Sequence, residues 1–231
     1  MKKAVVLALA LILVSAAALY AHDTWVGKEG NAFAVMWGHG KSGPYKPEYV
    51  KEAKAYDAAG KEVAVTIKPQ DTKAVLAPAK APALVAIVYK SGPWVKTPEG
   101  YKNVSKREAK NVITSLKSET HSKNLWQWNN RFSKPLGGKM ELVPLKNPLS
   151  LKVGDKFPFQ VFYNGKPLAG AKVRAAGVAK DSLKTDANGR AEIVITKKGF
   201  QIVVANLKTP TPNDPDADTL SETANLTFEV K

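Results

Sequence analysis

The three histidines, His22, His39 and His121, are the residues in this chain whose type and placement best suit chemistry. Neutral imidazole is a common protein ligand for nickel, copper and zinc ions. The usual signatures of catalysis are missing: the sequence has no cysteine, no Gly-x-Ser-x-Gly turn, no phosphate-binding glycine loop and no His-Glu-x-x-His pattern. The acidic residues are scattered, and nothing in their spacing pairs two of them as acid and base. We therefore expect a metal-binding protein and not an enzyme.

His22 directly follows an apolar leader. Lys2 and Lys3 precede an apolar run over residues 4–14, and small residues lead to Ala21. This layout is typical of a secretory signal peptide, so we predict a signal peptide over residues 1–21, cleavage after Ala21 and a periplasmic location. An uncleaved membrane anchor is the alternative, because the leader is nearly long enough to span a bilayer. The alanine-rich second half of the leader and the lack of a basic stop-transfer cluster disfavour it.

Cleavage at this point would give the mature chain an N-terminal histidine. The α-amine and the ring Nδ1 of His22 could then close a chelate ring on one metal ion, and an amine with a pKa of ~7.7–8.0 needs only a modest drop to bind at neutral pH. His39 lies between Gly38 and Gly40, which leave its backbone free to turn. With His121 as a third ligand, the site would be rich in nitrogen and would suit Cu(II) or Ni(II). Taken singly, each histidine is better explained as an ordinary residue: His22 at a frayed terminus, His39 in a turn and His121 on a helix surface.

The charge distribution and the lack of cysteine disfavour a nucleic-acid-binding site and exclude disulfide bonds. The formal net charge is +15, and it becomes +13 when Lys2 and Lys3 leave with the leader. The lysines are spread over the whole length and are not interleaved with aromatic residues, so we expect no nucleic-acid binding. With no cysteine, the 210 residues from His22 to Lys231 must be held together by core packing and not by disulfides.

Residues 22–146 are predicted to form a β-rich, metal-binding domain. We expect strands over 32–40 and 83–92, and a hairpin over 50–67 that turns at Ala59-Gly60. Ser105 and Glu108 form a capping-box pattern, and apolar residues follow at helical spacing. This pattern predicts a helix over 105–116, with a continuation through His121.

Residues 147–231 are predicted to form an Ig-like β-sandwich of about seven strands. Asn164-Gly165 and Asn188-Gly189 are strong hairpin signals, and short apolar strands follow. Three prolines in the segment 209–218 predict a long exposed loop before the last strand. The fold class is thus mostly β, with a β-rich N-terminal domain and a C-terminal Ig-like sandwich.

Eight segments taken together resemble the DUF4198 family: "AHDTW", "WGHG", "AYDAAGKEV", "SGPWVKTPEGYKN", "MELVPLKNPLSLKVGD", "NGKPLAGAKV", "KTDANGRAEI" and "ANLTFEV". These are exported proteins grouped with the periplasmic components of cobalt and nickel uptake systems. The resemblance implies Ni(II) or Co(II) as cargo, delivery to an inner-membrane uptake transporter, and contact with the membrane only through that transporter. Family members often carry a histidine late in the second domain, whereas this chain reads "IVVANLK" there. A ligand from the second domain is therefore not expected.

Two other functions stay open from the sequence. The chain could be a structural or adhesive Ig-type exported module whose histidines bind nothing. It could also be a copper enzyme of the histidine-brace kind, in which His22 and a second histidine activate oxygen. The sequence does not choose the metal, since Cu(II) would outcompete Ni(II) and Co(II) for such a site.

Overall fold

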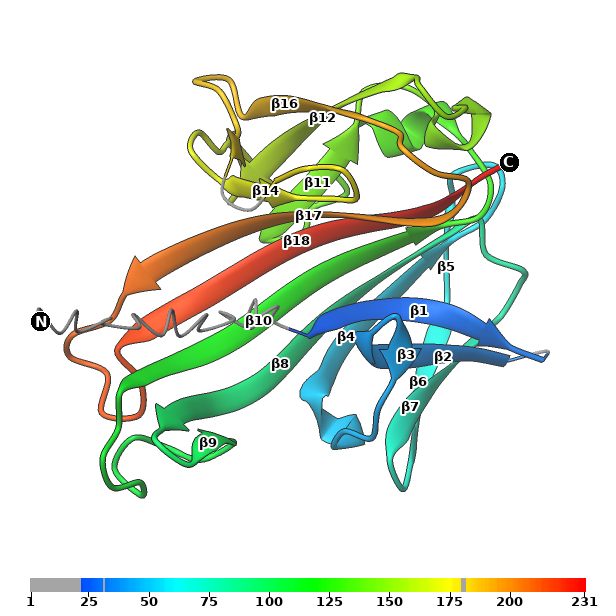
Figure 1. The fold of residues 1–231 in the computed structure, drawn as a ribbon. Helices are drawn as coiled ribbons and strands as arrows, with labels where there is room; N and C mark the ends of the chain where they lie inside the picture. The colour runs from blue at the N-terminus through cyan, green and yellow to red at the C-terminus, as the bar shows by residue number, and fades with distance from the viewer. Residues whose placement is uncertain (1–21, 31, 180–181) are drawn as a thin grey trace, which may run out of the picture.

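The computed structural model describes residues 22–30, 32–179 and 182–231. The described chain is mostly β, as predicted, and its strands form three sheets (Figure 1). The predicted signal peptide, residues 1–21, lies outside the described residues. Within the described residues, no helix has the length and apolar character needed to cross a membrane.

A nine-stranded sheet runs through the middle of the molecule. Its strands, in order, are β15 (Leu183–Lys184), β14 (Lys172–Arg174), β17 (Gly199–Pro210), β18 (Thr219–Val230), β10 (Thr114–Leu125), β8 (Leu84–Thr97), β4 (Val50–Tyr56) and β5 (Glu62–Val63), with β9 (Gly100–Lys102) also paired to β8. The neighbours β10 and β18 are parallel, whereas the other pairs in this sheet are antiparallel.

Two smaller sheets accompany it. The five-stranded sheet has the order β1 (Asp23–Glu29), β2 (Ala32–His39), β7 (Lys73–Pro78) and β6 (Val65–Gln70), with β3 (Lys41–Ser42) beside β2. The four-stranded sheet contains β11 (Met140–Pro144), β12 (Lys156–Tyr163), β13 (Lys166–Pro167) and β16 (Arg190–Val194). Single turns of 3₁₀-helix occur at η1 (Pro47–Tyr49), η2 (Asn130–Ser133) and η3 (Pro148–Ser150).

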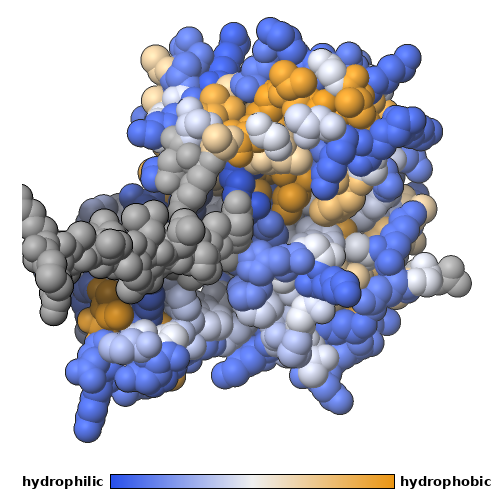
Figure 2. Space-filling view, viewed as in Figure 1, coloured by the Kyte–Doolittle hydropathy of each residue, from blue (hydrophilic) through white to orange (hydrophobic). Residues whose placement is uncertain are grey.

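The central sheet contributes side chains to two cores, one on each face, which gives the molecule three layers (Figure 1). Successive side chains of a strand point to opposite faces. On β8, Val85 packs with the core of the five-stranded sheet and Leu84 packs with the core of the four-stranded sheet. The first core includes Val35, and the second includes Phe157. In Figure 2, hydrophobic residues collect over the layer that contains β12 and β16, and hydrophilic residues surround them.

The central sheet contains strands from both sides of the predicted boundary at residues 146/147. β8 and β10 precede it, and β17 and β18 follow it. β11 also lies before the boundary but pairs with β12 beyond it. The division into a domain 22–146 and a domain 147–231 therefore stays a prediction, and the two parts share one continuous sheet.

Two of the predicted turns form hairpins and one does not. Gly60 has a φ of 75° between the paired strands β4 and β5. Asn164 and Gly165 both have positive φ, at 49° and 74°, and connect the paired strands β12 and β13. The turn at Asn188-Gly189 also forms, but the strand after it, β16, pairs with β12 and not with β15. That turn carries the chain from one sheet to another, so the hairpin prediction there is wrong.

The predicted helix over 105–116 is also wrong. One of the two capping-box hydrogen bonds does form, since the Ser105 N–H donates to the Glu108 carboxylate, whereas Ser105 Oγ accepts from the Arg107 N–H and not from that of Glu108. The chain then leaves helical geometry at Asn111, whose φ is 53°, and continues as β10 from Thr114. Pairing with β8 and β18 on both sides overrides the local helical pattern.

The loop predicted over 209–218 is shorter than expected, because Thr209 and Pro210 are the last residues of β17 and pair with Leu220 and Thr219. The connection from β17 to β18 is formed by residues 211–218. Its acidic residues form ion pairs with basic residues that precede or lie on β10, namely Asp214 with Lys117, Asp216 with Arg107 and Asp218 with Lys106. These contacts hold the loop against the start of β10.

Candidate metal-binding sites

His22 and His39 lie opposite each other at one end of the β1–β2 pair. Asp23 is paired with Gly38 in the antiparallel register, so the next pair outward is His22 with His39. Their imidazole rings are stacked, with centroids 4.4 Å apart and an interplanar angle of 30°. The Trp37 ring also stacks on the His22 ring, with centroids 3.9 Å apart. The structure thus brings two of the three predicted ligands together.

A glycine turn presents His39 beside His22. Gly38 has a φ of 156°, and a Cβ on it would lie 2.1 Å from the Lys41 carbonyl oxygen, so the chain can turn back here only with glycine. Gly40 has a φ of 73°, and β3 then folds back along β2. The two glycines that flank His39 in the sequence therefore shape the turn, as their pattern indicated.

Side chains of the central sheet hold β1, which is the edge strand of its own sheet. Asn124 Oδ1 accepts a hydrogen bond of 2.7 Å from the Val26 N–H, and Asn225 Nδ2 donates one of 2.9 Å to the Thr24 carbonyl. Asp23, next to His22, forms an ion pair with Arg174 of β14. The strand that carries His22 is therefore fixed to the neighbouring central sheet at several points along its length.

The surroundings of His22 favour its neutral form. Partial burial and the neighbouring His39 lower the pKa of His22 below its ordinary value of 6.5, and Asp23 opposes them more weakly. The neutral ring is the form that binds a metal ion. At neutral pH, His22 therefore has an imidazole nitrogen available for coordination.

His121 does not join this pair. On β10, Asn124 points towards β1, and residues 119, 121 and 123 alternate with it and point to the opposite face of the central sheet. There His121 is buried, with 8% of its surface exposed, and lines a cavity against the four-stranded layer. The predicted convergence of His22, His39 and His121 on one ion is therefore wrong.

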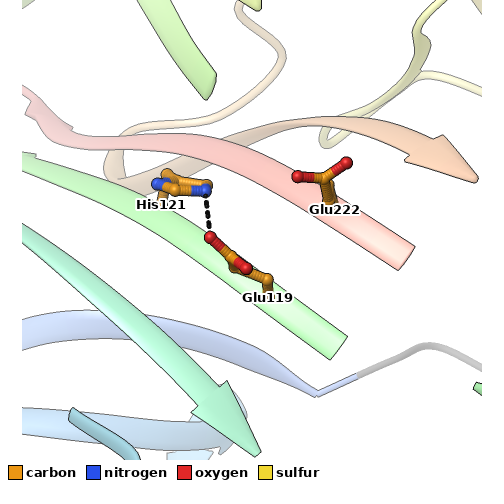
Figure 3. A group of neighbouring side chains, drawn as sticks. All are labelled: Glu119, His121 and Glu222. Carbon is orange, nitrogen blue, oxygen red and sulfur yellow. Dashed lines mark ion pairs between the residues drawn. The ribbon is translucent and has the colours of Figure 1, made fainter. Parts of the chain in front are cut away.

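His121 instead lies with two glutamates. Its Nε2 is 3.0 Å from Glu119 Oε1 on the same strand, and Glu222 lies on the neighbouring strand β18 (Figure 3). The three residues can each place one ligand atom within 4.8 Å of the others, and no other group of three or more metal-ligating side chains of this kind occurs in residues 22–30, 32–179 and 182–231. All three side chains are buried.

Lysines and a tyrosine surround this buried group. Lys90 forms an ion pair of 3.0 Å with Glu119, and Lys139 forms one of 2.5 Å with Glu222. The Tyr163 hydroxyl donates a hydrogen bond of 2.8 Å to the other Glu222 oxygen. Burial lowers the pKa of His121, although Glu119 and Glu222 act in the opposite direction.

Glu119 and Glu222 were missed from the sequence for different reasons. Glu119 is two residues before His121, a spacing that places both side chains on one face of a strand but not on one face of the helix that the local pattern predicts. Glu222 meets His121 only through the parallel pairing of β10 with β18, in which His121 is opposite Ala224 and Glu119 is opposite Glu222. No local signal in the sequence predicts that pairing.

A family model described as "Domain of unknown function (DUF4198)" matches residues 18–209. The chain belongs to the DUF4198 family. This confirms the resemblance read from the sequence, and the match covers the strands of the His22–His39 pair and the cavity that contains His121. The comparisons with curated proteins and with solved structures give no significant match. Since the DUF4198 description names no activity, the role of each site has to come from its geometry.

Proposed function

We propose that this DUF4198 protein is a periplasmic carrier of nickel or cobalt. In this proposal, cleavage after Ala21 makes His22 the first residue, His22 and His39 bind the ion, and the protein delivers it to an inner-membrane uptake transporter. The protein binds and transfers the ion and performs no catalysis.

The observation that carries the proposal is the pairing of His22 with His39 across β1 and β2. Two imidazoles 4.4 Å apart between ring centroids can turn towards one ion with small side-chain movements. The lowered pKa of His22 keeps its ring neutral at the pH of the periplasm. A free α-amine on His22 would add a third nitrogen, so that two residues supply three ligands.

The same three nitrogens also suit Cu(II), and this arrangement is that of a histidine-brace copper enzyme. The two functions differ in their chemistry once the ion is bound. A carrier holds Ni(II) or Co(II) without turnover, whereas a copper enzyme consumes oxygen and reductant. Oxygen uptake by the copper-loaded protein in the presence of ascorbate would favour the enzyme, and its absence would favour the carrier.

The sharpest test concerns the α-amine. We expect the mature protein from the periplasm to have the mass of a chain that begins at His22. Placing one glycine before His22 converts its amine into an amide, which coordinates only after a costly deprotonation. Calorimetric titration with Ni(II) and Co(II) should therefore show a loss of affinity for the extended chain nearly as large as that for His22→Ala.

The matched control is His121→Gln, which changes a histidine on the opposite face of the central sheet. It should leave binding at the His22–His39 pair unchanged, whereas His39→Ala should weaken it by at least about tenfold. Equal affinity in the extended and native chains would rule out the amine as a ligand. Unchanged affinity in both His22→Ala and His39→Ala would overturn the proposed site.

A further inference from the structure

We infer that Glu119, His121 and Glu222 form a second binding site for a divalent transition-metal ion. The site lies on the other face of the central sheet from His22 and His39, and it does not rest on the proposed carrier function. Its ligands would be one imidazole nitrogen from β10 and two carboxylate oxygens from β10 and β18 (Figure 3).

The spacing of the ligand atoms fits one shared ion. Metal–nitrogen and metal–oxygen bonds are ~2.0–2.2 Å long, so two ligands at right angles around one ion lie ~3.0 Å apart. Nε2 of His121 and Oε1 of Glu119 are 3.0 Å apart. Glu222 is close enough that one of its oxygens completes a group within 4.8 Å.

One ring nitrogen of His121, Nε2, is buried without a hydrogen-bond partner among the described residues. With 8% of the residue exposed, this nitrogen is shielded from solvent and forms no hydrogen bond within the described chain, although Glu119 Oε1 lies 3.0 Å away. A buried polar atom left without a partner destabilises the folded chain. Coordination to a metal ion would satisfy the Nε2 lone pair.

Two lysines neutralise the carboxylates when no metal ion is bound. Lys90 pairs with Glu119 and Lys139 pairs with Glu222, and their side chains are 46% and 38% exposed. Both lysines line a cavity of about 260 Å³ that reaches Glu119 and His121. Their ammonium groups can therefore swing into solvent through this cavity while an ion enters. One divalent ion would replace the two ammonium charges.

The donor set indicates the class of ion. One imidazole and two carboxylates are harder ligands than the nitrogens of the proposed His22–His39 site, so they suit Mn(II), Co(II) or Zn(II) better than Cu(I). The hydroxyl of Tyr163 donates to Glu222 Oε2, the oxygen opposite the one that contacts Lys139. This hydrogen bond orients the carboxylate, a role that residues behind metal ligands commonly have.

The test uses the full mature chain with both His22→Ala and His39→Ala. These substitutions remove the proposed His22–His39 site, called the first site. Titration with Co(II), followed by calorimetry and by the visible absorption of bound Co(II), should show one ion per chain. Adding His121→Gln should weaken binding by at least about tenfold. Failure of the first site and failure of this one are thereby measured separately.

Replacing a competing lysine gives the decisive result, because it changes an exposed side chain and is expected to preserve the fold. Lys90→Met should tighten Co(II) binding several-fold, since the ion no longer displaces an ammonium group from Glu119. The matched control, Lys54→Met, removes the same charge from the wall of the same cavity at a residue that forms no ion pair with the group within the described chain. It should have a smaller effect.

Circular dichroism and the melting temperature would check that each variant is folded. Absence of Co(II) binding in the His22→Ala/His39→Ala chain would overturn the inference and leave a purely structural ion-pair network. So would equal Co(II) affinity in folded His121→Gln, or equal effects of Lys90→Met and Lys54→Met.

Discussion

At the scale of single residues, the three histidines differ in what surrounds them. His22 and His39 lie at the open end of a strand pair, where a metal ion can reach both rings. His121 is buried and lies between charged side chains of opposite sign. The surroundings of His22 and His39 therefore suit the proposed capture of an ion at the surface, whereas those of His121 suit the inferred buried site with carboxylate ligands.

The closeness of His22 and His39 predicts a measurable coupling in the metal-free protein. Protonating either ring places a positive charge beside the other, and this contributes to the lowered pKa of His22. In His39→Ala, the pKa of His22 should rise towards 6.5, and in Asp23→Asn it should fall further, because Asp23 favours the charged ring. NMR titration of the His22 ring signals would measure both shifts.

Burial is the largest cause of the lowered pKa of His22, so neither variant should restore the ordinary value fully. His121→Gln, on the opposite face of the central sheet, provides the control and should leave the His22 titration unchanged. A His22 pKa that does not respond to His39→Ala would show that the two rings are not neighbours in solution.

At the scale of elements, the glycine turns can be predicted from the local sequence, whereas the strand β10 cannot. Turns with glycine at positive φ, such as Asn164-Gly165, are set by local backbone sterics and were predictable. In contrast, β10 contains seven consecutive buried residues, from Glu119 to Leu125, of which six are polar or charged. A strand of this composition has no apolar alternation, so its identity depends on β8 and β18, which are distant in the sequence.

β10 also contains a buried ion pair, between Lys123 and Glu141, whose side chains are both almost fully shielded from solvent. Glu141 also accepts hydrogen bonds from the backbone N–H groups of Leu136, Gly137 and Gly138. Burial alone would raise the pKa of Glu141, but Lys123 and these N–H groups outweigh it and lower the pKa overall. The carboxylate therefore joins β10 to the segment that leads into β11.

Removing one partner of this pair should be costly. Glu141→Gln keeps an oxygen for the backbone N–H groups but leaves the Lys123 ammonium buried without a counter-charge, so the free energy of unfolding should fall by about 3–5 kcal/mol. Adding Lys123→Met should recover part of that loss, because the buried charge is then gone. Urea denaturation of the single and double variants would measure this.

An exposed ion pair provides the comparison. Lys156 and Glu192 have side chains that are 71% and 44% exposed, so Glu192→Gln should change the free energy of unfolding by no more than about 1 kcal/mol. If Glu141→Gln were as mild as Glu192→Gln, the Lys123–Glu141 pair would not be a buried charge pair in solution.

At the scale of the whole molecule, the central sheet makes the two predicted domains depend on each other. β18, the last strand, lies between β17 and β10 and pairs with both along its length. Asn225 of β18 also bonds to β1, near the opposite end of the sequence. The first site therefore depends for its position on the C-terminal strand, although both of its histidines belong to residues 22–146.

This architecture predicts that the mature protein unfolds in one cooperative transition. The five tryptophans, Trp25, Trp37, Trp94, Trp126 and Trp128, all precede residue 147, so their fluorescence reports on the first part of the chain. Far-UV circular dichroism reports on strands of all three sheets. In urea, the two signals should give the same midpoint and the same slope, which is the behaviour of a single folding unit.

A core variant in the second part sharpens this test. Leu226 of β18 is fully buried, and Leu226→Ala should lower the free energy of unfolding by about 2–5 kcal/mol. Although no tryptophan lies in that part of the sequence, the fluorescence midpoint should shift as far as the circular dichroism midpoint, because β10 loses its pairing when β18 unfolds. A fluorescence midpoint unchanged by Leu226→Ala would mean that residues 22–146 fold as a separate domain, and that β10 keeps its structure without β18.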